Sequence, residues 1–201
     1  MKKPQTPRPY RQTTRAEAAK DTLEAILNAA RELTAEKWLD ELTLDEIAER
    51  AGVASRTVFR KFGSRDELIT AMADRYRAEL EANERKPPAP GAIKEAISLL
   101  IESYERDGQY NLRGLAQEMR WPFIEEMFRS ARARHRRFVQ TVFQPDLRRV
   151  AVQDRPQLLA QLEVATWMTT WKYFRIDLGF SKQNTGNAML SMVKAIISPH
   201  S

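Results

Sequence analysis

The chain contains no cysteine and only two histidines, His135 and His200, among its 201 residues. Without cysteine it can form neither a disulfide nor a thiolate metal site, which fits a reducing compartment such as the cytoplasm. The two histidines are distant in sequence, and neither has a companion at the spacing of a metal site or a catalytic dyad. No nucleophile motif and no glycine-rich phosphate loop is present. The sequence therefore predicts no metal, no cofactor and no enzymatic activity.

Long apolar runs are also absent. No apolar stretch reaches the roughly 18 residues that suggest a transmembrane helix, and the basic amino terminus is not followed by the apolar segment of a secretory signal. No alternating strand pattern, internal repeat or low-complexity tract appears, whereas 42% of the residues are hydrophobic. We expect an all-α, cytoplasmic protein with a substantial core.

The positive charge is unevenly distributed. The net charge is +6, yet residues 21–82 carry nine basic and fourteen acidic residues, against six basic and one acidic in residues 1–20. Within this acidic region, five basic residues and no acidic one lie between Arg50 and Arg65. A basic patch on an otherwise acidic domain is typical of a surface that faces DNA.

Residues 43–62, TLDEIAERAGVASRTVFRKF, have the pattern of two short helices joined by a tight turn. Thr43 and Glu46 have the spacing of a capping box at the start of the first helix. Gly52 lies where a helix ends in a left-handed residue that glycine adopts easily. These signals predict a helix-turn-helix, the second helix of which enters a DNA major groove.

The second of these helices is expected to begin with Ser55 as its cap. Val58 and Phe62, four residues apart, can face the core together. The residues left pointing outward are basic or polar: Arg56, Thr57, Arg60 and Lys61.

The flanking segments complete the pattern. The preceding helix has one apolar stripe and ends near Trp38, and the following segment, with RDELI at its start, has a second capping box at Ser64 and Glu67. LTLDEIAERAGVASRTVFRKF in this setting resembles the tetracycline-repressor (TetR) family of bacterial transcription regulators. The resemblance covers about residues 20–80 strongly, and the rest of the chain through its length and helical character alone.

The resemblance implies a DNA-binding transcriptional regulator, most often a repressor, with a separate ligand-binding and dimerisation domain. The implied DNA-binding residues are Thr43, Ser55, Arg56, Thr57, Phe59, Arg60, Lys61 and Arg65. Phe59 stands where the family commonly has a tyrosine that contacts a phosphate, and Arg65 where it commonly has a lysine. Two alternatives stay open: Phe59 as a core residue and Arg65 as a solvated surface charge.

Proline and glycine mark the domain boundaries. Residues 1–15 contain three prolines and no helical periodicity, so we expect a flexible basic arm, either a solubilising tail or a minor-groove contact through Arg8, Arg11 and Arg15. ERKPPAPGA at residues 84–92 marks a linker. The predicted organisation is an arm (1–15), a DNA-binding domain with its connecting helix (16–82), a linker (83–92) and a ligand-binding and dimerisation domain (93–201).

In the last domain, we expect helices near residues 91–106, 111–120, 122–143, 156–178 and 182–198, with breaks at Asp107–Gly108 and Pro145 among others. Apolar stripes on the final two helices predict a homodimer, which can bind a palindromic operator, although the same stripes can be intramolecular core. The interface candidates are Leu162, Phe174, Leu178, Met189, Met192, Val193 and Ile196.

Methionine and aromatic residues of the same domain can line a pocket for a small, largely apolar effector, although each of them can instead be ordinary core. The candidates are Tyr104, Met119, Trp121, Phe123, Met127, Trp167, Met168 and Trp171. A basic helix, RSARARHRRF at residues 129–138, can either bind an acidic partner or be a solvated face. The alternative function is therefore a DNA-bound scaffold controlled by a protein partner. Neither the ligand, the operator sequence nor the sign of regulation follows from the sequence.

Overall fold

The computed structural model of the chain describes residues 10–82 and 86–198 and divides the chain into two compact units, residues 1–80 and 81–201. We call them the head and the carboxyl-terminal unit. All regular structure in the described residues is helical, which confirms the all-α prediction. No helix in these two ranges is both long and apolar enough to cross a membrane.

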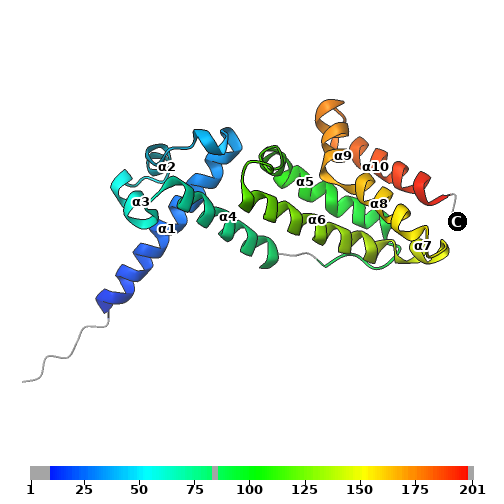
Figure 1. Cartoon of the computed structure of the whole chain (residues 1–201), viewed down its shortest axis with the longest axis horizontal. Helices are drawn as coiled ribbons and strands as arrows, with labels where there is room; N and C mark the ends of the chain where they lie inside the picture. Colours follow the sequence, from blue (N-terminus) through cyan, green and yellow to red (C-terminus); the bar gives the residue numbers. More distant parts are fainter. Residues whose placement is uncertain (1–9, 83–85, 199–201) are drawn as a thin grey trace, which may run out of the picture. The chain divides into compact units, whose positions relative to one another are not determined.

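The head contains five helical segments around one core (Figure 1): α1 (Tyr10–Glu36), the 3₁₀ turn η1 (Leu39–Glu41), α2 (Leu44–Arg50), α3 (Ser55–Phe62) and α4 (Arg65–Ala82). Apolar residues at helical spacing supply this core because one face of each helix is buried. Its fully buried members include Ile26, Ala30, Ile47, Val58, Leu68 and Ile69.

Helix α1 begins at Tyr10 and so includes residues 10–15, which we expected in the arm. Pro9 is the last proline before this helix, and nothing from Tyr10 onward interrupts a helix. The arm prediction was therefore wrong for residues 10–15. Its remaining part, with Arg8, lies outside the described residues.

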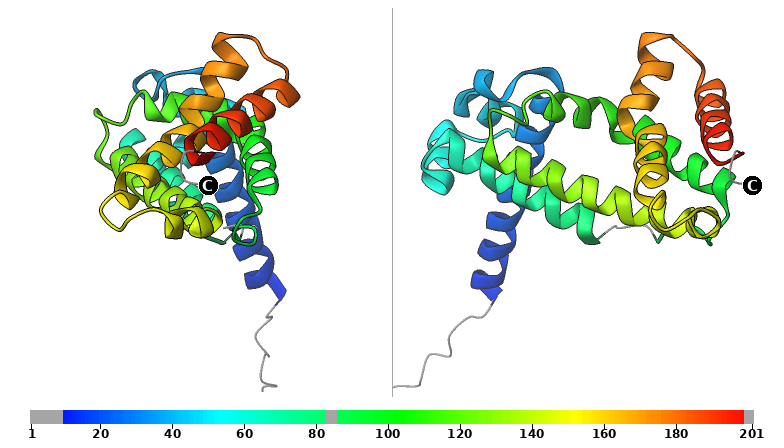
Figure 2. Two further views of the ribbon diagram at one scale, coloured as in Figure 1. Left: turned by 90° about the vertical axis from the view of Figure 1, so that its right-hand side faces the viewer. Right: turned by 45° about the vertical axis from the view of Figure 1, so that its right-hand side comes forward.

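The carboxyl-terminal unit is a helical bundle (Figure 2): α5 (Ile93–Leu115), α6 (Pro122–Val142), α7 (Gln144–Arg149), α8 (Arg155–Thr166), α9 (Met168–Lys172), a π-helical turn η2 (Tyr173–Asp177) and α10 (Lys182–Ile197). Helix α10 packs against α5 and α8, and α6 packs against the same two helices. The core between them includes Ile101, Val139, Leu162, Met189 and Val193.

Three helix boundaries of this unit differ from the prediction. The expected break at Asp107–Gly108 is absent, because Gly108 lies inside α5 and makes room for a side chain from α9. A Cβ atom at Gly108 would lie 2.5 Å from the Trp171 ring. Residues 116–120, expected in a helix, form successive turns. A break expected at Pro145 is instead the first turn of the short helix α7, where proline is tolerated.

The helix expected over residues 156–178 is interrupted at Trp167, whose backbone is extended (φ −74°, ψ 157°). No proline or glycine marks the interruption. Side chains bond the carbonyls that the break frees: the Tyr104 hydroxyl donates to the Thr166 carbonyl at 2.9 Å, and the Thr170 hydroxyl donates to the Val164 carbonyl at 2.6 Å. Since Tyr104 comes from α5, more than sixty residues earlier in the chain, local sequence patterns do not reveal the break.

Candidate DNA-binding surface

Helix α2 begins with the capping box that its sequence predicts. The Glu46 amide donates to the Thr43 hydroxyl at 3.2 Å, and the Thr43 amide donates to the Glu46 carboxylate at 3.2 Å. Hydrogen bonds from Lys37 and then from the Thr43 hydroxyl lower the pKa of Glu46. The donor groups of Thr43 are therefore engaged within the head.

The turn between α2 and α3 also has its predicted geometry. Gly52 has φ +67°, and the Val53 amide donates to the Ala48 carbonyl at 2.9 Å, which closes the turn. The predicted cap was one residue late, because Ala54 occupies the cap position and Ser55 is the first helical residue. Ser55 therefore lies in the exposed first turn of α3, and no side-chain hydrogen bond caps this helix.

Helix α3 divides sharply into a buried and an exposed face. Val58 is completely buried and Phe62 is half-buried, as their spacing predicts. Thr57 is half-buried at the edge of the exposed face. The side chains that face solvent are Arg56, Phe59, Arg60 and Lys61.

Phe59 is the one aromatic residue on that exposed face. Phe59 is 60% exposed, so the interpretation of Phe59 as a core residue was wrong. Basic residues flank this exposed ring, with Arg56 three residues before it and Arg60 directly after it.

The five basic residues between Arg50 and Arg65 differ in what they contact. Arg50 pairs bidentately with Glu36 at 3.0 Å for both nitrogen–oxygen contacts, and this hydrogen bonding lowers the pKa of Glu36. The Lys61 ammonium donates to the Ala19 carbonyl of α1 at 3.1 Å. Arg65 donates to the Asp40 carbonyl at 3.0 Å. Three of the five therefore stabilise the head itself.

The other two are available to a ligand. Arg56 and Arg60 are exposed, and neither side chain makes a hydrogen bond or ion pair within the described residues. They lie four residues apart and so share one side of α3. Two guanidinium groups presented together on an exposed helix can bind base edges or phosphates.

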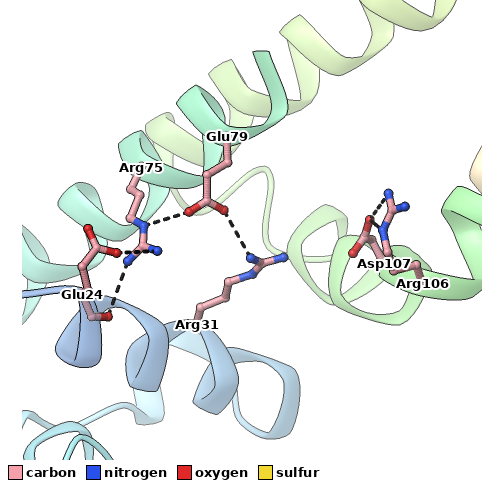
Figure 3. Close-up of polar contacts among 6 residues, drawn as sticks. All are labelled: Glu24, Arg31, Arg75, Glu79, Arg106 and Asp107. Atoms are coloured by element: carbon pink, nitrogen blue, oxygen red, sulfur yellow. Dashed lines mark hydrogen bonds and ion pairs between the residues drawn. The ribbon is translucent and has the colours of Figure 1, made fainter. Parts of the chain in front are cut away.

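An ion network that sequence reasoning missed fastens α1 to α4 (Figure 3). Arg75 of α4 pairs with Glu24 at 2.7 Å and with Glu79 at 2.8 Å, and Glu79 also accepts from Arg31 at 3.4 Å. The Arg31 guanidinium lies 4.6 Å from the centre of the Tyr76 ring, a cation–π contact. Only the Arg75–Glu79 pair, four residues apart on one helix, was recognisable from spacing.

The eight candidate ligand residues are dispersed within the carboxyl-terminal unit. Tyr104 and Trp171 have ring centres 5.9 Å apart, and Trp121 and Phe123 have ring centres 5.7 Å apart. Met168 and Trp171 are core residues, whereas Met119 is fully exposed. Trp167 and Met127 are half-buried.

A buried polar cluster that the sequence did not indicate lies at the Trp167 break. The His135 Nε2 atom is 3.0 Å from the Thr166 hydroxyl and 3.2 Å from the Glu163 carbonyl. Because a carbonyl only accepts, Nε2 carries the proton. Burial lowers the pKa of His135 to about 4, so the ring is neutral at neutral pH. The Trp167 ring meets it edge-on, with centres 4.9 Å apart.

Acidic neighbours accompany the arginine-rich segment of α6. Arg129 pairs with Glu126, Arg132 with Glu118, and Arg136 with Glu163 at 3.3 Å. Glu118 and Glu163 come from other segments of the same unit, so these pairs hold α6 to its neighbours.

The seven interface candidates fall into two groups. Leu162, Met189 and Val193 are completely buried in the core of the unit. Leu178 and Met192 are 48% and 36% exposed. Phe174 and Ile196 are partly buried against the core. Further exposed apolar residues of the unit are Val164 on α8, Tyr173 and Ile176 in η2, and Phe180 just before α10.

Residues 26–72, which run from the carboxyl-terminal part of α1 to the first part of α4, match the family described as bacterial regulatory proteins, tetR family. No curated protein matches the chain.

Solved structures with the same fold cover nearly the whole chain. A transcriptional regulator from Rhodococcus sp. Rha1 is 16% identical with a TM-score of 0.66, covering 88% of this chain and 96% of that one. A transcriptional regulator (TerR/AcrR family) from Aquifex aeolicus VF5 is 19% identical with a TM-score of 0.61, covering 87% and 99%. The flavonoid-responsive regulator FrrA is 19% identical with a TM-score of 0.59, covering 89% and 96%. At these identities the likeness shows the fold.

Proposed function

The chain is a member of the tetR family of bacterial regulatory proteins, and from this premise we propose that it is a sequence-specific repressor released from a palindromic operator by a small, largely apolar ligand. DNA-binding regulation of transcription is the activity of the family as a whole, and it fits the expectation that the chain is not an enzyme. The proposal assigns the protein to the cytoplasm. It also keeps the division into a DNA-binding domain (16–82), a linker (83–92) and a ligand-binding and dimerisation domain (93–201).

The observation that carries the proposal is the pair of partner-free arginines on the exposed face of α3. Arginine binds the O6 and N7 atoms of guanine bidentately, the commonest specific contact in a major groove. We assign this role to Arg56 and Arg60. Ser55, Thr57 and Lys61 contribute polar contacts from the same helix. Thr43 and Arg65, at the starts of α2 and α4, contact phosphates by exchanging the hydrogen bonds that they make to Glu46, Asp40 and Asp66 within the head.

The shortness of α3 supports a homodimer, because one helix of this length reads few bases. Two copies about 34–36 Å apart can read a palindrome on one face of DNA. The exposed apolar residues around Leu178 and Met192 support association through α8, η2 and α10. In this proposal, the buried candidates Leu162, Met189 and Val193 belong to the core of the unit rather than to the interface itself.

Release by a small ligand requires that the ligand binds better to a conformation that binds DNA poorly, because linkage is reciprocal. A typical coupling of about 1–3 kcal/mol changes DNA affinity roughly 5- to 150-fold. The aromatic pairs Tyr104–Trp171 and Trp121–Phe123 support an apolar site in the carboxyl-terminal unit. FrrA, which shares the fold, is described as flavonoid-responsive, and this supports a small effector rather than a protein.

The alternative function, a DNA-bound scaffold controlled by a protein partner, relied on the basic helix 129–138. Its support is weaker, since Arg129, Arg132 and Arg136 pair with glutamates of the same unit. A partner captured through this helix, together with operator binding that no ligand in a broad screen changes, would favour the scaffold.

To test the proposal, sequences that bind the protein are selected from a random duplex pool. The affinity for the selected operator is then measured at several salt concentrations. We expect a palindromic consensus and a steep fall in affinity with salt, because each phosphate contact releases counterions. Weak binding without a consensus would contradict the proposal. A ligand screen on the selected operator then tests release.

A further inference from the structure

Phe59 is the one large apolar side chain that α3 presents to solvent. The other apolar residues of this helix, Val58 and Phe62, are buried and half-buried, whereas Phe59 is 60% exposed. Among the described residues, its ring makes no contact with another aromatic side chain or with a guanidinium group. The fold of the head therefore does not need this phenyl ring.

The position of Phe59 relates it to the surface already assigned to DNA. It follows Arg56 by three residues and precedes Arg60 by one, so all three lie on the exposed side of α3. Both arginines are partner-free in the described residues. If the arginines read base edges, as proposed above, a group beside them on α3 also lies in the major groove.

The chemistry of the ring restricts what it can bind there. A phenyl ring has neither donor nor acceptor, so it forms no conventional hydrogen bond with a phosphate or a base edge. Burying it is favourable only against apolar surface. The single apolar group on the base edges of the major groove is the 5-methyl group of thymine.

We propose that Phe59 determines part of the operator sequence by packing against a thymine 5-methyl group in the major groove. The inference rests on the proposed function, because it requires α3 to enter that groove.

The helix geometry also predicts where this thymine lies. Residues three apart are separated by about 4.5 Å along the helix axis, and successive bases of one strand by about 3.4 Å. The thymine therefore lies one or two base pairs from the guanine that Arg56 contacts. Each half-site of the selected operator is expected to contain this combination.

The test replaces each dT of the selected operator with dU, one symmetric pair at a time, since dU lacks only the methyl group. Affinity is measured by fluorescence anisotropy for the unsubstituted protein and for Phe59→Ala. For one thymine pair we expect a loss of about fourfold per half-site, or about fifteenfold for both, from the loss of one buried methyl group each. For Phe59→Ala the same replacement should have no effect.

Two control variants make the comparison specific. Phe59→Leu retains an apolar side chain and should keep part of the dU effect, whereas Arg56→Ala should weaken binding and leave the dU effect unchanged. Because Phe59 is exposed, the urea unfolding midpoint of Phe59→Ala should match that of the unsubstituted protein, which separates lost contact from lost folding.

The outcomes distinguish failure of the thymine contact from failure of the proposed function. A selected operator on which no dU replacement matters, or on which the loss persists in Phe59→Ala, would overturn the thymine contact and leave the proposed function standing. An equal loss of affinity for every sequence in Phe59→Ala would show that the ring packs on the sugar–phosphate backbone and would also overturn it. Failure to select any consensus would overturn the proposed function itself.

Discussion

Two helices of this chain are rich in arginine, α3 in the head and α6 in the carboxyl-terminal unit, and they differ in the carboxylates around them. Three of the five arginines of α6, Arg129, Arg132 and Arg136, each pair with a glutamate. On α3, Arg56 and Arg60 pair with nothing in the described residues. Local density of positive charge is similar in the two segments, so density alone does not identify a nucleic-acid interface. The carboxylates beside the arginines of α6, and their absence beside Arg56 and Arg60 in the described residues, favour α3 as the DNA-facing helix.

This difference predicts that substitutions on the two helices affect different properties of the protein. Substitutions on the exposed face of α3 should change DNA affinity and leave the free energy of unfolding almost unchanged. Substitutions on α6 should have the opposite effect.

The largest effect is expected for the double variant Arg56→Ala/Arg60→Ala. Each base contact of this kind contributes about 1–3 kcal/mol of discrimination, so operator affinity should fall at least about 30-fold. The matched control is Arg132→Ala/Arg136→Ala, which removes the same charge from α6 and should change affinity less than about twofold. Anisotropy titrations at several salt concentrations measure both. Equal losses in the two variants would mean that net charge alone determines binding.

The salt slope separates two roles for the α3 arginines. If they contact bases, the variant should lose its preference for the selected operator over random duplex. If they contact only phosphate, affinity should fall equally for both DNAs, with a shallower slope.

The next effect concerns the buried side of α6. Burial lowers the pKa of His135 from 6.5 to about 4. Between these values the unfolded chain binds a proton that the folded chain does not, so the free energy of unfolding should fall as the pH falls from about 6.5 to 4, by up to about 3 kcal/mol. Urea denaturation followed by tryptophan fluorescence measures it, since Trp167 lies against the histidine.

His135→Gln is the control for that pH dependence. Glutamine retains an N–H donor for the Glu163 carbonyl but does not titrate, so the part of the pH dependence due to His135 should disappear. Identical pH profiles for the two proteins would contradict the assignment of a neutral, buried imidazole.

Thr43→Ala is expected to have a smaller effect, on both the stability of the head and its affinity for the operator. The variant removes the hydroxyl that accepts from the Glu46 amide, and loss of such a cap typically costs about 1 kcal/mol. The urea midpoint of the head and the operator affinity should both decrease, because α2 supports α3. A loss of affinity with unchanged stability would show that Thr43 acts only through phosphate.

The smallest effect is expected for the free energy of unfolding of Arg132→Ala. Arg132 contacts both carboxylate oxygens of Glu118, but the arginine side chain is 48% exposed. We expect a loss of about 0.5–1 kcal/mol at low salt, which shrinks at high salt because exposed charges are screened. A loss independent of salt would indicate that the methylene groups of Arg132 matter more than its charge.

The head was predictable from sequence because its signals are local. The Thr43–Glu46 box and the positive φ of Gly52 depend on residues within one or two turns of the helix they end or begin. The position of Ser55 was predicted one residue late, within the usual uncertainty of helix ends. The exposure of Phe59 depends on the packing of α3 as a whole, and the periodicity of Val58 and Phe62 does not determine it.

The carboxyl-terminal unit was less predictable because its decisive contacts join distant residues. Gly108 was taken as a break, yet it accommodates Trp171, more than sixty residues later in the chain. The break at Trp167 is stabilised by Tyr104 from α5 and His135 from α6. For the same reason, composition could not separate pocket aromatics from core aromatics: the core needs Trp171 and Met168 whatever ligand is bound.

The ion network between α1 and α4 has a mechanical consequence. Arg75 and Arg31 fasten the middle of α4 to α1 through Glu24 and Glu79, on the side of α1 that also packs in the core. Bending α4 within this stretch would break several ion pairs at once. A force on the carboxyl end of α4 is therefore expected to move α4 together with α1. The contacts of Arg75 and Arg31 therefore contribute to the stiffness of α4 along this stretch.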